Sequence, residues 1–186
     1  MTQLIAEIGA LIVSLDQFVV DILVSIRDPA ITKVMNSVTG LGSATAAAVI
    51  VGLLYVADLH EEVATSVLAL GLTGPVVLTL MGLVQRPFPP HPVCVTSGEM
   101  VAHSFPSGHA AGVTVFALLA VRSDRLPLAP TAVLAVLIAV SRMYLGTHYL
   151  SDTLVGIAIG AAAFFIVTRW MVASQQRLTH VIKNYH

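Results

Sequence analysis

Long apolar runs separated by short polar or charged stretches dominate the pattern of this sequence. One uncharged run covers residues 63–85, enough to span a hydrocarbon core of roughly 30 Å at about 1.5 Å per helical residue. Four further apolar runs cover residues 38–57, 107–121, 126–141 and 153–168. The pattern predicts five spanning helices joined by short connections.

The first 27 residues follow a different pattern, in which polar residues recur at helical spacing. These residues are Gln3, Glu7, Ser14, Gln17, Asp21 and Ser25, and Asp16 adds a further carboxylate beside them. Two aspartates in one span would be costly at the centre of a bilayer. The pattern therefore favours an amphipathic helix that lies in the membrane interface. A sixth spanning helix, with its polar stripe packed inward, is the alternative.

Composition agrees with a membrane protein. Hydrophobic residues make up 56% of the 186 residues and charged residues only 10%, whereas a soluble domain has about 25% charged residues. We expect an all-α integral membrane bundle in one domain over residues 1–186, with no nucleic-acid partner because the net charge is −1. Within it, we expect the amphipathic helix and its connection over 1–35, the core over 36–172 and a tail over 173–186. The pattern leaves a homo-oligomer open.

Basic residues predict the orientation of the chain in the cell membrane. With five spans, the side of the tail carries Arg122, Arg125, Arg169, Arg177 and Lys183. The opposite side carries Arg27, Lys33, Arg86 and Arg142. The positive-inside rule then places the C-terminus in the cytoplasm and the opposite ends of the spans at the extracytoplasmic face.

Reactive side chains collect at these opposite ends. They are Arg86, Ser107, His109, Arg142, His148 and Asp152. So many ionisable groups at one face of an apolar bundle indicate a functional site.

The residue types at this face suit an anion. Pro106 fits the first turn of a helix, and the backbone N–H groups of Ser107 and Gly108 would then point at a phosphate. Arg86 and Arg142 can each hold phosphate oxygens with two hydrogen bonds. We therefore predict a phosphate-binding site made of Arg86, Ser107, Gly108 and Arg142.

The histidines supply candidate catalytic groups. His148 and Asp152 are four residues apart, so they share one helical face, and a carboxylate there can hold one imidazole nitrogen and leave the other basic. His148 is thus the predicted nucleophile and Asp152 its orienting partner. His109 could protonate the leaving oxygen.

These residues resemble a known family. Arg86-Pro87, the run 106–109, and Ser141-Arg142 followed by His148 and Asp152 are similar to the three signature motifs of the type 2 phosphatidic acid phosphatase superfamily. The resemblance implies an all-α membrane fold and metal-independent phosphate ester hydrolysis without a cofactor. It also implies a phosphohistidine at His148, with His109 as general acid.

One position departs from the family pattern. The lysine that normally lies seven residues before the motif arginine is Thr79 here, so we expect the phosphate pocket to lack one cation. His91 and His103 are candidates to replace it. Cys94 and Glu99 are expected to be loop residues without a catalytic role.

The functional hypothesis is a membrane phosphatase acting on a lipid phosphate or a polyprenyl diphosphate, because the reactive groups lie where lipid headgroups lie. A lipid phosphotransferase would use the same intermediate. A weakened binding member of the family, suggested by Thr79, and a transporter are the alternatives outside catalysis.

Overall fold

The computed structural model describes residues 2–93 and 103–184, and within these ranges the chain forms seven helices and no strand. The helices are α1 (Thr2–Ser25), α2 (Pro29–Gly40), α3 (Ala44–Val56), α4 (His60–Val84), α5 (Gly108–Arg122), α6 (Leu128–Tyr144) and α7 (Leu150–Asn184). The all-α class is confirmed. Cys94 and Glu99 lie outside the described residues.

Fewer helices than predicted pass a length and hydropathy criterion for crossing a bilayer. In the described part of the chain, α1, α4 and the stretch Leu150–Arg177 of α7 pass it, and the bent pair α2–α3 would add a fourth span. Helices α5 and α6 are apolar but shorter. The chain therefore has several apolar helices that suit a multi-pass membrane protein, while a count of five or six spans stays a prediction.

The run 38–57, predicted as one span, is two helices in the structure. Helix α2 ends at Gly40, α3 begins at Ala44, and their axes differ by 55°. The Ser43 side chain accepts a hydrogen bond from Ala46 N at 3.1 Å, so it caps a new helix where the apolar run seemed continuous. The uninterrupted hydrophobicity of the run hid this break.

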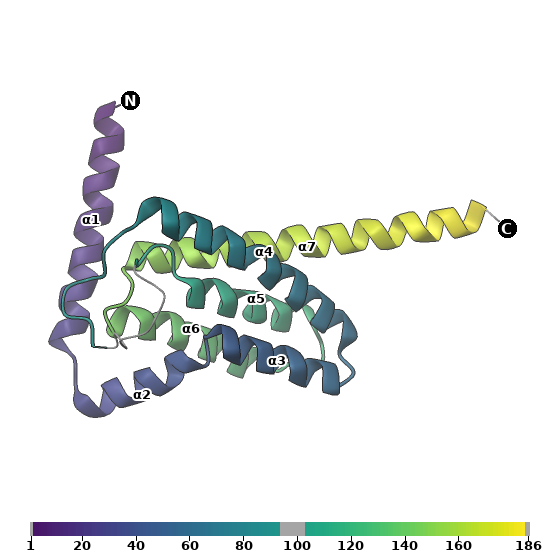
Figure 1. The fold of residues 1–186 in the computed structure, drawn as a ribbon, viewed down its shortest axis with the longest axis horizontal. Coiled ribbons are helices and arrows are strands. Elements are labelled where there is room, and N and C mark those ends of the chain that lie inside the picture. The colour runs from purple at the N-terminus through teal and green to yellow at the C-terminus, as the bar shows by residue number, and fades with distance from the viewer. Residues whose placement is uncertain (1, 94–102, 185–186) are drawn as a thin grey trace.

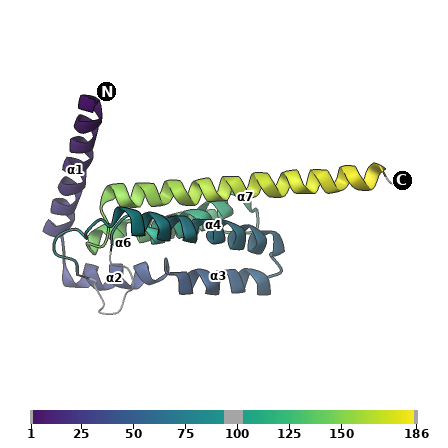
Figure 2. The same ribbon diagram turned by 45° about the horizontal axis from the view of Figure 1, so that its top comes forward.

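Helix α1 stands apart from the other helices. In both views of the ribbon it runs across the end of the bundle rather than along it (Figures 1 and 2). Its buried residues are Asp16 and Val20, and most of its large apolar side chains are exposed. Such a direction is expected of a helix in the membrane interface, although the length and composition of α1 also allow a span.

Helix α5 lies at the centre of the bundle and contacts α3, α4, α6 and α7. Its packing against α7 is close because α7 has glycines at the contact. A Cβ at Gly156 would lie 2.3 Å from the Ser107 carbonyl oxygen, and one at Gly160 would lie 2.2 Å from that of Ala111. These glycines let the two backbones touch within one chain.

The two ends of the bundle differ in their polar residues. At one end, Arg122 lies 3.6 Å from Glu61, and the Ser123 hydroxyl donates to the Glu62 carboxylate at 2.6 Å. The connections 58–62 and 122–125 thus share this end of the bundle. The predicted site lies at the other end, where α4 and α6 finish and α5 and α7 begin.

Candidate active site

The segments that carry the predicted site residues meet at one end of the bundle. The Ser104 N–H donates to the Arg86 carbonyl at 2.8 Å, and the Ser107 N–H donates to the Asp152 carbonyl at 3.0 Å. The His148 N–H donates to the Arg142 carbonyl at 3.3 Å. The first two bonds join segments that are far apart in the sequence, and the third closes the turn between α6 and α7.

His148 is buried, with 2% of its surface exposed, in the turn before α7. Its Nδ1 makes a short hydrogen bond to the carbonyl oxygen of Ser104. Since a carbonyl can only accept, Nδ1 carries the proton, and Nε2 is left with a free lone pair. Burial and, to a smaller extent, the positive charge of Arg142 lower the pKa of His148 to about 3. The imidazole is therefore neutral near pH 7, as a nucleophile must be.

Asp152 is not the group that orients His148. Within the described residues, its carboxylate binds the Arg86 guanidinium at 2.5 Å and the Tyr149 N–H at 2.8 Å. The Ser104 carbonyl holds the imidazole instead. Because Asp152 lies in the first turn of α7, its carboxylate caps that turn, which brings it to Tyr149 N rather than to the ring of His148.

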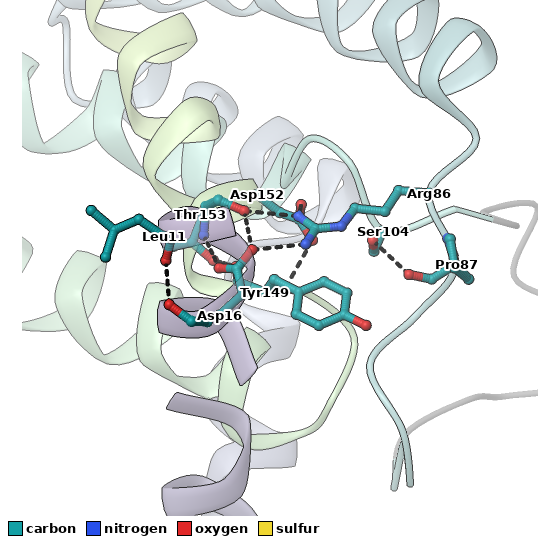
Figure 3. A network of polar contacts seen from close by, with 10 residues as sticks. Leu11, Asp16, Arg86, Pro87, Ser104, Tyr149, Asp152 and Thr153 are labelled. Carbon is teal, nitrogen blue, oxygen red and sulfur yellow. Dashed lines mark hydrogen bonds and ion pairs between the residues drawn. The ribbon is translucent and has the colours of Figure 1, made fainter. Parts of the chain in front are cut away.

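Arg86 follows directly on the left-handed residue Gln85, which ends α4. Its guanidinium lies between two carboxylates, at 2.5 Å from Asp152 and 2.7 Å from Asp16, and 3.9 Å above the Tyr149 ring (Figure 3). Burial on its own would lower the pKa of Arg86, but the two carboxylates raise it overall. Both ends of the guanidinium fork are thus occupied by residues of the chain.

The start of α5 differs in detail from the prediction. The helix begins at Gly108 and Ser107 is its N-cap, so Pro106 precedes the helix rather than forming its first turn. The Ser107 hydroxyl accepts from Ala110 N at 3.4 Å. Because the Ser107 N–H already donates to Asp152, it is not available to a phosphate, whereas Gly108 does line the cavity described next.

A cavity of about 920 Å³ opens between α3, α4 and α5 and ends at the predicted catalytic groups. Its polar end carries His109, His148 and Arg142, while its walls are mostly apolar. The walls come from 42–44, 47, 48 and 51, from Val67, Leu70, Thr73, Gly74, Val77, Leu78 and Met81, and from Gly108 and Gly112. From Val67 to Met81 the wall follows α4 for about 20 Å, at 1.5 Å per residue. Of the seven predicted site residues, this cavity gathers His109, His148, Arg142 and Gly108.

Arg142 and His109 lie beside the end of α2 and the bend that follows it. The Arg142 guanidinium donates to the Thr39 hydroxyl at 3.1 Å. A Cβ on Gly42 would lie 3.0 Å from the imidazole carbon Cδ2 of His109. The break that the apolar pattern concealed thus supports one wall of the site.

Position 79, where the family pattern has a lysine, does not face this cavity. Thr79 is exposed on α4 and does not line it, since the lining positions Thr73, Val77 and Met81 recur on a different face of the helix. His91 and His103 do not line it either. The His91 carbonyl instead accepts a hydrogen bond from Arg27 at 2.6 Å.

Several residues of this region were not foreseen from the sequence. Asp16 and Ser151 hold Arg86, Ser104 holds His148, and Thr39 holds Arg142. Only Asp16 left a signal, because it is a carboxylate in an apolar helix. Over the described ranges, no cluster of three or more histidine, cysteine or acidic side chains is arranged to hold a metal ion.

Comparison with known proteins adds an independent observation. Residues 62–176 match the model of the PAP2 superfamily. The decaprenylphosphoryl-5-phosphoribose phosphatase of Mycobacterium tuberculosis strain H37Rv is 41% identical over 93 residues, which are 50% of this chain and 51% of that protein. The chain thus matches about half the length of these mycobacterial relatives. Phosphatidylglycerophosphatase B of Bacillus subtilis strain 168 is 26% identical over 170 residues, 83% of this chain and 82% of the relative.

Solved structures have the same fold. The transmembrane PAP2-type phosphatidylglycerolphosphate phosphatase from Bacillus subtilis superposes with a TM-score of 0.73 at 25% identity, over 86% of each chain. LpxE of Aquifex aeolicus superposes with a TM-score of 0.66 at 25% identity, over 86% of this chain and 95% of that one. Since the family model matches more than half of the chain and includes every predicted catalytic residue, the protein belongs to the PAP2 superfamily.

Proposed function

We propose that this protein is a metal-independent membrane phosphatase that removes a phosphate from a lipid through a phosphohistidine at His148. The observation that carries the proposal is the cavity, whose apolar walls end at His109, His148 and Arg142. Apolar walls suit the hydrocarbon part of a lipid, and the polar end suits its phosphate. The relatives named above are phosphatases of phosphorylated lipids.

The chemistry follows from the protonation of His148. Its free Nε2 attacks phosphorus, a P–N bond forms and the P–O bond to the lipid alcohol breaks. The negative charge of the bound phosphate offsets the burial and the positive charge of Arg142, which disfavour the protonated imidazole of His109, and the protonated His109 then donates its proton to the leaving oxygen. Water attacks the phosphohistidine, His109 takes up the proton that the water loses, and the P–N bond breaks to release phosphate and the neutral imidazole of His148. Arg142 and the N–H groups at the start of α5 beside Gly108 stabilise the charge on the phosphoryl oxygens.

The structure changes the role that we propose for Arg86. Its guanidinium is bound by Asp16 and Asp152 and does not line the cavity. We therefore propose that Arg86 and Asp152 support the turn that carries His148, and that Arg142 is the principal cation for the phosphate.

We further propose that the site opens at the extracytoplasmic face and that the C-terminus is cytoplasmic. The excess of basic residues on the side of the tail supports this orientation. Arg86 and Arg142 are committed to contacts at the site, which leaves fewer free basic residues on the opposite side.

The leading substrate class is a polyprenyl-linked phosphate. A channel of about 20 Å along α4 accommodates part of a long chain, and the mycobacterial relative of 41% identity is named for a decaprenyl lipid. Phosphatidylglycerophosphate is the second candidate, after the Bacillus subtilis relative.

A substrate panel with the purified protein tests the proposal. Phosphate release is measured from decaprenylphosphoryl-5-phosphoribose, a polyprenyl diphosphate, phosphatidylglycerophosphate and phosphatidate, with and without chelator. We expect release from at least one lipid, no effect of chelator, and loss of release in His148→Ala. Undiminished release by that variant, or complete loss on chelation, would refute the mechanism. Transfer of labelled phosphate to an acceptor lipid would make the protein a phosphotransferase instead.

A further inference from the structure

Asp16 is a buried carboxylate in a helix that is otherwise mostly exposed. Its side chain is 2% exposed, whereas the apolar residues Leu15 and Phe18 beside it are 46% and 62% exposed. A buried charge is costly unless its oxygens are paired and hydrogen-bonded. The contacts of Asp16 therefore decide how α1 joins the bundle.

Both carboxylate oxygens of Asp16 are engaged. Oδ1 accepts the backbone N–H of Ser151 at 2.8 Å, and Oδ2 accepts the Ser151 hydroxyl at 2.6 Å and the Arg86 guanidinium at 2.7 Å. Ser151 lies in the first turn of α7, whose N–H groups have no partner within the helix. Asp16 thus caps α7 from another helix, at the end where a negative charge is favourable.

Asp16 and Asp152 both bind the Arg86 guanidinium and the backbone of the segment that follows His148. Each carboxylate holds one end of the Arg86 fork, and each accepts a backbone N–H from the segment that follows His148. Figure 3 shows Asp16 and Asp152 next to the Arg86 guanidinium, with the Tyr149 ring below it.

Arg86 is also connected to His148 through hydrogen bonds of Ser104. The Arg86 carbonyl accepts the N–H of Ser104, whose hydroxyl donates to the Pro87 carbonyl at 3.0 Å. The carbonyl of Ser104 is the group that holds Nδ1 of His148. Asp16 therefore acts on the imidazole both through the first turn of α7 and through Arg86 and Ser104.

We propose that Asp16 is a positioning residue for the nucleophile, so that α1 is part of the machinery of the site and not only a membrane anchor. The inference rests on the proposed function, since it takes His148 as the nucleophile. It predicts that loss of the Asp16 charge slows the chemical step and leaves the binding of the lipid in the cavity nearly unchanged, because Asp16 does not line the cavity.

The test compares Asp16→Asn with Asp21→Asn in the full chain, reconstituted in lipid nanodiscs. Asp21 lies on the same helix, is exposed and accepts a hydrogen bond from Gln17 at 3.0 Å, so it is a matched control. We expect kcat of Asp16→Asn to fall about 10- to 100-fold, the range for a displacement of about 1 Å at a catalytic group. KM should change less than about threefold, and Asp21→Asn should behave as the wild type.

A double-mutant cycle separates positioning from a general loss of structure. Ser151→Ala removes a hydroxyl that donates to Asp16 and accepts from Arg86 at 2.8 Å, so the loss of kcat in the double variant should be smaller than the sum of the losses in the two single variants. Each kcat is referred to the folded protein recovered by size-exclusion chromatography. Additive effects, or a fall in kcat that disappears after this correction, would overturn the inference.

The His148→Ala variant keeps the two proposals distinguishable. If it hydrolyses the lipid as well as the wild type, the proposed function fails. If it is inactive while Asp16→Asn and Asp21→Asn are equally active, only the role of Asp16 is wrong.

Discussion

The glycine contact between α7 and α5 allows a quantitative prediction, the effect of Gly156→Ala. The new Cβ would lie 2.3 Å from the Ser107 carbonyl oxygen and 3.3 Å from Ala110 Cβ. The oxygen cannot turn aside without cost, because it accepts the Ala111 N–H at 3.1 Å. Non-bonded heavy atoms prefer separations of about 3.5 Å, so the two helices must move apart by about 1 Å.

This separation acts directly on the site. Helix α5 carries His109 and His148 lies two residues before α7, so the same movement separates the proposed acid from the nucleophile. Overpacking of this kind costs about 1–3 kcal/mol of stability. A displacement of about 1 Å at a catalytic group costs about 100-fold in rate, close to 2.7 kcal/mol.

The assay is kcat for phosphate release in nanodiscs, together with the thermal unfolding midpoint in detergent. Gly71→Ala on α4 is the matched control, since a Cβ there meets nothing within 4 Å. We expect its kcat to stay within about twofold of the wild type. A folded Gly156→Ala protein with wild-type kcat would refute the argument that this contact sets the geometry of the site.

Three further outcomes are expected. Burial lowers the pKa of His148 to about 3, so below pH 6.5 the unfolded chain binds a proton that the folded chain does not. The free energy of unfolding therefore falls as the pH drops below 6.5, by up to about 1.4 kcal/mol per pH unit. Between pH 7 and pH 5 the unfolding midpoint should fall less in His148→Gln than in the wild type, and an equal fall would exclude this origin. Thr79→Lys should leave kcat and KM within about twofold, since Thr79 is exposed outside the cavity; a large gain in phosphate release would show that the lysine reaches the phosphate. Gly42→Ala should lower kcat roughly tenfold, part of the 10²–10⁴ that a general acid contributes, because its Cβ would lie 2.6 Å from Ile138 Cγ2 and 3.0 Å from the His109 ring, so that the bend must move relative to His109. Gly40→Ala, with nothing within 4 Å of its Cβ, is the control for that substitution and should retain wild-type kcat.

The apolar runs of the sequence predicted the positions of several helices. The run 107–121 became Gly108–Arg122, and the run 126–141 became Leu128–Tyr144, since charged and capping residues mark where each helix leaves the apolar region. Helix α7 is longer than its run 153–168 because a helix can continue into polar sequence once it has left the bundle. The break at Gly40–Ser43 was missed because hydropathy does not register a change of direction.

The site was predictable in its side chains but not in its partners. The sequence pattern predicted that Arg86, His148 and Asp152 lie at one end of the bundle. It also predicted that Asp152 binds the imidazole of His148. The structure pairs the imidazole with the Ser104 carbonyl. Every residue carries a carbonyl, so no residue type marks this one. The contact between Asp16 and Arg86 depends on the direction in which α1 crosses the bundle, which helical periodicity does not contain.

The shortness of α5 has a consequence for the surrounding lipid. At 1.5 Å per residue its 15 residues rise about 22 Å, some 8 Å less than a typical hydrocarbon core. If α5 crosses the bilayer, the acyl layer beside it must be compressed, or the phosphate must be drawn below the level of neighbouring headgroups. Turnover would then depend on acyl chain length as well as on headgroup chemistry, and the membrane itself would contribute to the choice of substrate.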